Sequence, residues 1–149
     1  MPAVQLTRFS DYGLRLLMYL AHHHERAAAV TIGEIAERFA ISRNHLVKVA
    51  HFLTQQGWVR GTRGKGGGLA LARAPGEYRV GRLVRALEGQ GAVIDCADPP
   101  CLLAGGCRLK GSLERAMQRF YDELDQQTLA DLISAPTAAR LHRLPLRRA

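Results

Sequence analysis

The chain has 149 residues, enough for one ordinary hydrophobic core and a small appended element. Its hydrophobic fraction of 47% is typical of a globular protein and argues against a disordered chain. Lys and Arg number 21 against 13 Asp and Glu, and the resulting net charge of +8 favours a polyanionic partner, with nucleic acid first.

The amino-terminal segment contains no apolar stretch of signal-peptide length. The longest apolar run near it, residues 16–21, is too short to span a membrane. Cysteines that are not exported stay reduced, so the three cysteines of the chain are expected to be free thiols. The sequence therefore predicts a cytoplasmic protein with no membrane partner.

Two helices are expected at the start of the chain. Apolar residues recur at three- and four-residue intervals from about Thr7 to His24, which predicts the first helix. Thr31 and Glu34 form a capping box, in which each side chain satisfies a backbone amide of the other residue. This box predicts a short second helix over residues 32–39.

A third helix and a hairpin follow. Ser42 is a good cap for a helix that runs to about Gln56, and Gly57 ends it as a C-cap glycine does. Residues 58–71 then contain two short β runs around a tip rich in glycine and cations, which predicts a hairpin. This order of elements is that of a winged helix-turn-helix. We therefore expect a mainly α fold with a small β-hairpin wing and a long dimerisation helix.

The third helix and the hairpin carry the candidate DNA contacts. Polar and basic residues crowd the amino-terminal half of the helix, the half that enters the major groove in this fold. The hairpin tip combines glycines, which allow close approach of phosphates, with three cations. A nucleotide-binding loop is excluded because Gly66 follows Lys65 where Ser or Thr is needed. The predicted DNA-binding residues are Ser42, Arg43, Asn44, His45, Lys48, Arg60, Arg63, Lys65 and Arg15 of the first helix.

The second half of the chain is expected to begin with a small helix over 80–87. After an intervening loop, a helix of about four turns shows an apolar stripe, which we expect to pack against a second copy of the chain. The residues proposed for dimerisation are Leu113, Met117, Phe120 and Leu124. The predicted division is 1–80 for the winged helix-turn-helix, 81–108 for the small helix and cluster-binding loop, 109–133 for the dimerisation helix and a short terminal helix, and 134–149 for a loosely ordered tail.

All three cysteines lie in that intervening loop, at Cys96, Cys101 and Cys107. A Pro- and Gly-rich loop of this length lets thiolates bend toward one point, as a soft metal or an iron–sulfur cluster requires. The odd number of cysteines argues against a disulfide framework. A zinc site is an alternative, although no histidine follows Cys107 at the usual spacing. An enzyme with a cysteine nucleophile has no support, and we assign no catalytic residues.

Five segments together resemble NsrR, the nitric-oxide-sensing branch of the iron–sulfur winged-helix regulators that also include IscR. The segments are residues 9–15, 42–48, 63–68, 83–88 and 107–110. The resemblance spans about residues 6–133, and the absence of a histidine just past Cys107 favours NsrR over IscR. It implies a repressor that binds a palindromic operator in double-stranded DNA as a homodimer.

The resemblance also implies one iron–sulfur cluster per subunit, of the 4Fe–4S or 2Fe–2S type. Cys96, Cys101 and Cys107 would hold the iron, with Asp11 of the other subunit as the fourth ligand. From the sequence alone, Asp11 is better explained as a carboxylate that stabilises the first turns of a helix, and the resemblance reverses this preference. The implied signal is nitric oxide, which would release the repressor from DNA. The alternative is a winged-helix regulator whose cysteines hold zinc or sense redox state directly.

Overall fold

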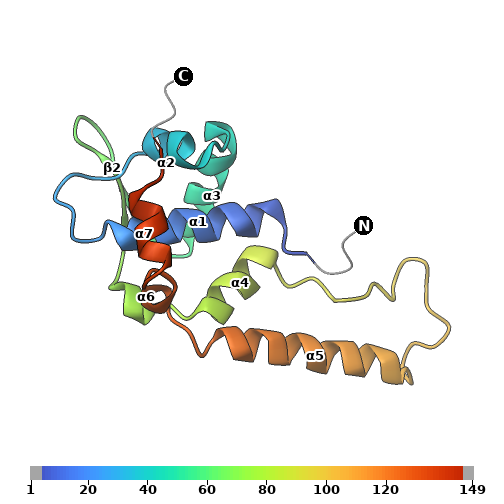
Figure 1. The fold of residues 1–149 in the computed structure, drawn as a ribbon. Coiled ribbons are helices and arrows are strands. Elements are labelled where there is room, and N and C mark those ends of the chain that lie inside the picture. The colour runs from blue at the N-terminus through green and yellow to red at the C-terminus, as the bar shows by residue number, and fades with distance from the viewer. Residues whose placement is uncertain (1–4, 146–149) are drawn as a thin grey trace.

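The structure is a computed structural model that describes residues 5–145 (Figure 1). Seven α-helices, one short 3-10 helix and one hairpin occur in these residues. In chain order they are α1 (Arg8–His22), α2 (Ile32–Phe39), α3 (Arg43–Gln55), β1 (Val59–Thr62), β2 (Gly68–Leu71), η1 (Pro75–Glu77), α4 (Val80–Glu88), α5 (Arg108–Leu124), α6 (Leu129–Leu132) and α7 (Thr137–His142). The fold is mostly helical with a two-stranded antiparallel hairpin, and the predicted fold class is confirmed.

Local capping sets where the first helices begin. The hydroxyl of Thr7 accepts from the amide of Ser10 at 3.2 Å and starts α1. The hydroxyl of Thr31 accepts from the amide of Glu34 at 3.0 Å and starts α2. Such caps satisfy amides that have no partner inside the helix. The chain leaves α2 through Ala40, whose φ of 54° reverses its direction toward α3.

The hairpin pairs Val59 with Leu71 and Thr62 with Gly68. Val30, just before α2, adds an isolated antiparallel bridge to Leu69 on the outer side of β2. A side chain at Gly68 would meet the carbonyl oxygen of Val30 at 2.5 Å, so glycine is required at this close approach. The wing is therefore tied to the segment that leads into the helix-turn-helix.

Helix α1 lies at the centre of the fold (Figure 1). Its side chains Leu16, Leu17 and Leu20 are almost completely buried, and the helix packs against α3, α4, α6 and β2. The buried side of α3 is formed by Leu46, Val49, Ala50 and Leu53, the residues that the sequence pattern predicts. Burial of leucines of this size stabilises the fold by about 2 kcal/mol each.

Helix α5 packs against α4 and projects along one side of the molecule (Figure 1). Asp125, at its end, accepts from the amide of Arg82 at 2.8 Å and so caps the start of α4. The guanidinium of Arg85 lies 4.3 Å from the ring centroid of Tyr121. A side chain at Gly81 would meet the carbonyl oxygen of Tyr121 at 2.2 Å, so the two helices approach closely here.

The structure differs from the expectation of a loosely ordered tail over 134–149. Residues 137–142 form α7, in which Leu141 is buried in the core cluster. Arg38 of α2 donates to the carbonyl oxygen of Leu144, so this segment is also held by the helix-turn-helix. Residues 146–149 of the predicted tail lie outside the described residues. Within residues 5–145, no helix has the length and apolar character needed to cross a membrane.

Candidate DNA-binding surface and cysteine loop

The exposed face of α3 presents the polar residues predicted to contact DNA. Arg43, Asn44, His45 and Lys48 are all exposed, and Leu46 and Val49 anchor the opposite face in the core. Ser42 occupies the N-cap position, but its side chain makes no capping hydrogen bond. Its hydroxyl is therefore free to act as a donor or acceptor toward another group.

The hairpin brings a second set of cations beside α3. Gly64 and Gly66 have positive φ values of 93° and 78°, which place a tight turn at the tip next to Lys65. Arg63, at this tip, lines a groove of about 490 Å³ together with Arg43 at the start of α3. Cations from the helix and from the wing thus face the same groove.

Arg60 does not line this groove. It lies at the base of the hairpin and lines a separate cavity of about 660 Å³. The sequence groups Arg60 with Arg63 and Lys65 because all three fall within six residues. In the structure Arg60 lies within β1 and lines the separate cavity, whereas Arg63 lies at the tip and lines the groove. The predicted DNA contact of Arg60 stays a prediction.

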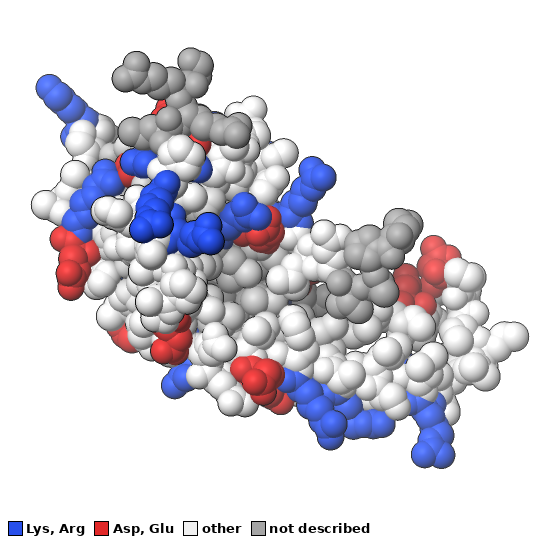
Figure 2. All heavy atoms as spheres, in the orientation of Figure 1, with Lys and Arg blue, Asp and Glu red and all other residues white. Residues whose placement is uncertain are grey.

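The surface charge is unevenly distributed. Figure 2 shows Lys and Arg side chains gathered over the half of the molecule that holds α1, α2 and the hairpin, and again along α5. The acidic side chains on this face occur as small separate groups. A clustered positive potential of this kind attracts the phosphates of a nucleic acid.

Helix α1 connects the predicted sensor residues with α3. Arg15 Nε donates to Asp11 Oδ1 at 2.8 Å, so the two residues share a face as their spacing predicts. Tyr12, the next residue after Asp11, stacks on the imidazole of His45 with ring centroids 6.0 Å apart and an interplanar angle of 26°. A movement of the first turns of α1 would therefore shift His45 on the exposed face of α3.

The cysteine loop runs from the end of α4 to the start of α5 and lies at the opposite end of the molecule from the hairpin (Figure 1). Cys96, Cys101 and Cys107 are free thiols, each half-buried. The amide of Cys101 donates to the carbonyl oxygen of Cys96 at 3.0 Å, and Cys107 is the N-cap residue of α5. Next to Cys101, the side chain of Leu102 is completely exposed.

The residue types of this loop fit an iron–sulfur cluster, because such clusters are held by cysteine thiolates. Their positions are not yet those of a metal centre. Among residues 5–145, no three or more His, Cys, Asp or Glu side chains are grouped closely enough to hold a metal ion. The three thiols would have to approach one another, and Asp11 would have to exchange its bond with Arg15, before a cluster could be bound. The predicted ligand set stays a prediction.

The predicted dimerisation stripe lies on a helix without a single fully buried residue. Leu113, Met117 and Leu124 are half-buried, whereas Phe120 is 41% exposed. Met117 and Tyr121 also line a cavity of about 340 Å³ against α4 and residues 89–93. Part of the stripe is thus covered within the same chain, and its pairing with a second copy stays a prediction.

Three residues make contacts between distant segments that the sequence pattern does not predict. Tyr12 contacts His45 across 33 positions, and Asp125 caps α4 across 43 positions. Arg38 reaches Leu144 across 106 positions. Periodicity and spacing report on neighbours along the chain, so they carry no signal for these contacts.

Solved structures support a common fold and a common class of protein. IscR of T. potens is 28% identical, with a TM-score of 0.73 over 93% of this chain and 92% of that chain. CymR, described as the global cysteine regulator of B. subtilis, is 26% identical, with a TM-score of 0.71 over 87% of this chain and 95% of that chain. The oxidized form of S. aureus CymR is 26% identical, with a TM-score of 0.68 over 87% and 95%.

The same assignment follows from the sequence along most of its length. Residues 6–135 match the Rrf2 family, which is described as "Iron-dependent Transcriptional regulator". The match includes the helix-turn-helix, the wing, the cysteine loop and α5. The chain therefore belongs to the Rrf2 family of transcriptional regulators, with the winged-helix fold that its structure and its exposed basic helix independently indicate.

Proposed function

We propose that this protein is a transcriptional repressor that binds a palindromic operator as a homodimer and is released from it by nitric oxide. The observation that carries the DNA-binding part is the shared groove of Arg43 and Arg63. A recognition helix reads base edges from the major groove while a neighbouring wing holds the phosphate backbone. The exposed Asn44 and Arg43 have the side chains best suited to adenine and guanine.

In this proposal, residues 1–80 bind DNA, 81–108 carry the sensor loop and 109–133 form the dimer contact. The exposed Phe120 leaves an apolar part of α5 available to a second copy. A two-fold dimer places two recognition helices about one DNA turn apart, which explains why the operator is palindromic.

The sensor is proposed to be an iron–sulfur cluster held by Cys96, Cys101 and Cys107, with Asp11 of the partner subunit completing the set. When bound, the cluster would supply iron that reacts with nitric oxide. The cysteine loop then has to close, because its thiols are not grouped in the present arrangement. Asp11 must release Arg15, whose guanidinium becomes free for a phosphate.

The link from sensor to DNA is proposed to pass through α1. Asp11 and Tyr12 are consecutive, and Tyr12 stacks on His45 in α3. A shift of the first turns of α1 changes the position of His45 relative to the major groove. Coupling of about 1–3 kcal/mol between the two sites corresponds to about a 5- to 150-fold change in operator affinity.

The test is to purify the protein without oxygen, reconstitute it with iron and sulfide, and measure operator binding before and after adding nitric oxide. Iron content and visible charge-transfer absorption report whether a cluster is present. The proposal expects tight binding by the loaded dimer and loss of binding after nitric oxide. Equal binding by loaded, gas-treated and metal-free protein would show that the loop does not control DNA binding.

A second candidate is a regulator whose cysteines hold zinc or sense redox state directly. Its thiol-redox form is favoured by the free, half-buried thiols that are not grouped as metal ligands, and by the likeness to CymR in its oxidized form. The same purification separates the two candidates. Colourless protein that contains zinc, or protein whose DNA affinity follows reversible thiol oxidation, supports the second one.

A further inference from the structure

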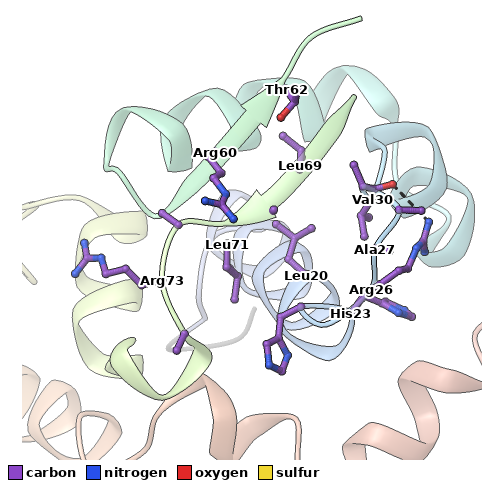
Figure 3. A pocket seen from close by; sticks show the side chains of 16 residues that line it. Leu20, His23, Arg26, Ala27, Val30, Arg60, Thr62, Leu69, Leu71 and Arg73 are labelled. Carbon is purple, nitrogen blue, oxygen red and sulfur yellow. Dashed lines mark hydrogen bonds between the residues drawn. The ribbon is translucent and has the colours of Figure 1, made fainter. Parts of the chain in front are cut away.

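A cavity of about 660 Å³ lies behind the hairpin (Figure 3). Its walls come from three separate segments: the end of α1 with the loop that follows it, the two strands, and the residues just after β2. This volume is within the range of cavities that bind small molecules. The cavity contains none of the residues predicted to bind the cluster, and Arg43 and Arg63 of the DNA groove are also absent from its lining.

Small side chains make the space. The lining includes six alanines, at positions 27, 28, 29, 70, 72 and 74. Leu20, Leu69 and Leu71 also line the cavity, but each is at most 9% exposed, so the alanines supply much of its accessible apolar surface. A ligand with an apolar body could displace water from the alanine methyl groups and gain about 25 cal/mol for each Å² that it covers.

The polar part of the lining is basic. Arg26, Arg60, Arg73 and two histidines line the cavity, and none of the described acidic residues does. Arg26 is already neutralised, since its guanidinium donates to both carboxylate oxygens of Glu34 at 2.7 and 3.0 Å. Burial lowers the pKa of His23, which therefore acts as a neutral hydrogen-bonding group at pH 7.

Arg60 is the cation that remains available. Figure 3 shows its guanidinium over the space between the strands and Leu20, whereas Arg73 points away from the centre. Within residues 5–145, Arg60 has no ion-pair partner. Arg73 also has no ion pair in residues 5–145, but it is directed away, so Arg60 is the uncompensated charge that faces the alanines, an arrangement complementary to an organic monoanion.

We propose that this cavity binds a small organic anion that carries one carboxylate or phosphate on a short apolar body. The anionic group pairs with Arg60, and the body covers the alanines of the lining, among them Ala70, which is paired with Arg60 in the hairpin. Arg donates two parallel hydrogen bonds to such groups, which fixes their orientation. The ligand is a second input, independent of the cysteine loop.

Such a ligand would act on the wing. The amide of Leu69 donates to the carbonyl oxygen of Val30 at 2.7 Å, and Val30 directly precedes Thr31, the cap of α2. An occupant that touches both the loop and the strands stiffens the wing relative to α2. The effect on operator binding rests on the proposed function, whereas binding of the anion itself does not.

The test is a titration of the full chain, without DNA, with benzoate, phenyl phosphate, citrate and inorganic phosphate. Isothermal calorimetry gives the affinity, and amide chemical shifts locate the site. We expect benzoate or phenyl phosphate to saturate with a Kd below about 1 mM. The shifts should be confined to the segments 20–30, 60–62 and 69–74, from which the lining residues come. The citrate and inorganic phosphate arms should bind more weakly, because they lack an apolar body.

Two variants and a matched control make the test specific. Arg60→Ala should weaken binding at least about tenfold, and Ala70→Leu should do the same by filling the space without changing charge. Arg63→Ala, three residues away in the DNA groove, should bind the anion as the wild type does. Circular dichroism confirms that each variant is folded.

Three outcomes would overturn the proposal. One is the absence of saturation with every anion. The second is equal weakening by Arg60→Ala and Arg63→Ala, which would indicate general surface charge. The third is that neither the wild type nor Arg60→Ala binds an anion, while Arg60→Ala loses as much operator affinity as Arg63→Ala does. That result would make Arg60 a DNA contact. Failure of operator binding alone would instead count against the proposed function.

Discussion

Tyr12 in α1 stacks on His45 in α3, with ring centroids 6.0 Å apart and an interplanar angle of 26°. Tyr12 directly follows Asp11, the residue proposed to join the sensor of the other subunit, and His45 is exposed on the face proposed to read DNA. The pair is therefore a direct contact between the helix of the proposed sensor residue and the helix proposed to read the operator. A cavity of about 290 Å³ beside it, lined also by Arg8 and Lys48, leaves room for the rings to move.

Replacing Tyr12 by Ala should weaken operator binding and reduce the difference between loaded and metal-free protein. Aromatic pairs contribute about 0.5–1.5 kcal/mol beyond their burial, so the Kd should rise about two- to tenfold. Tyr12→Phe keeps the stacked ring and is the matched control. Fluorescence anisotropy with a labelled operator gives both values. Equal affinities for Tyr12→Ala and Tyr12→Phe would show that stacking does not position His45.

Single substitutions in α3 and in the wing should weaken DNA binding in different ways. Asn44→Ala is expected to cost about 1–3 kcal/mol on the operator and little on unrelated DNA, because a base contact is lost. Lys65→Ala should weaken binding to all sequences and lower the slope of log K against log salt by about 1. Salt titrations on operator and random DNA check both. The assignment of helix to bases and wing to phosphates would be wrong if the two variants behaved alike.

Phe120→Asp should convert the dimer into a monomer. Phe120 is 41% exposed in the single chain, so the change leaves the fold of the monomer intact but places a charge in an apolar contact. Light scattering after size-exclusion chromatography measures the mass. Arg119→Asp introduces the same charge at the adjacent exposed position, off the stripe, and should remain dimeric. A dimeric Phe120→Asp protein would place the interface elsewhere.

Glu34 should make stability depend on pH. Its carboxylate accepts from Arg26 and, at 2.7 Å, from the hydroxyl of Tyr19, and the bond from Arg26 is the main cause that lowers the pKa of Glu34 below its usual 4.5. A lowered pKa in the folded state gives stability that is complete above pH 4.5 and is lost as the pH falls through the folded value.

Glu34→Gln removes this titration. At neutral pH the variant should be less stable by about 1–3 kcal/mol, because a charged hydrogen-bonding partner of Arg26 is lost. Toward acid pH the difference from the wild type should shrink. Urea unfolding at several pH values measures the free energy of unfolding for both proteins. A difference that stays constant across the acid range would exclude the titration of Glu34 as its cause.

Local features of this fold could be predicted from the sequence because they depend on residues one turn apart. The cap at Thr31 and the pair of Asp11 and Arg15 are of this kind. The other half of the predicted capping box does not form, because the carboxylate of Glu34 accepts from Arg26 and Tyr19 instead. The glycines at the hairpin tip are also local signals, since their positive φ values suit no other residue as well.

Features that join distant segments could not be predicted in the same way. Helix α7 is only six residues long, and it is held by burial of Leu141 and by Arg38, so its own sequence carries little helical signal. The position of Arg60 follows from strand alternation, but its cavity exists because the loop at Ala27–Val30 lies across the hairpin. The cysteine spacing likewise identifies the candidate thiols but does not determine the distances between their sulfur atoms in the fold.

The most direct measurement compares operator occupancy by the wild type and by a variant with Ser at positions 96, 101 and 107. Both are purified without oxygen and treated in parallel with and without nitric oxide, and DNase footprinting reports occupancy. We predict that the wild type protects the operator until the gas is added, and that the serine variant gives weak protection unaffected by it. Full protection by the serine variant, with a normal response to nitric oxide, would contradict control of DNA binding by the cysteine loop.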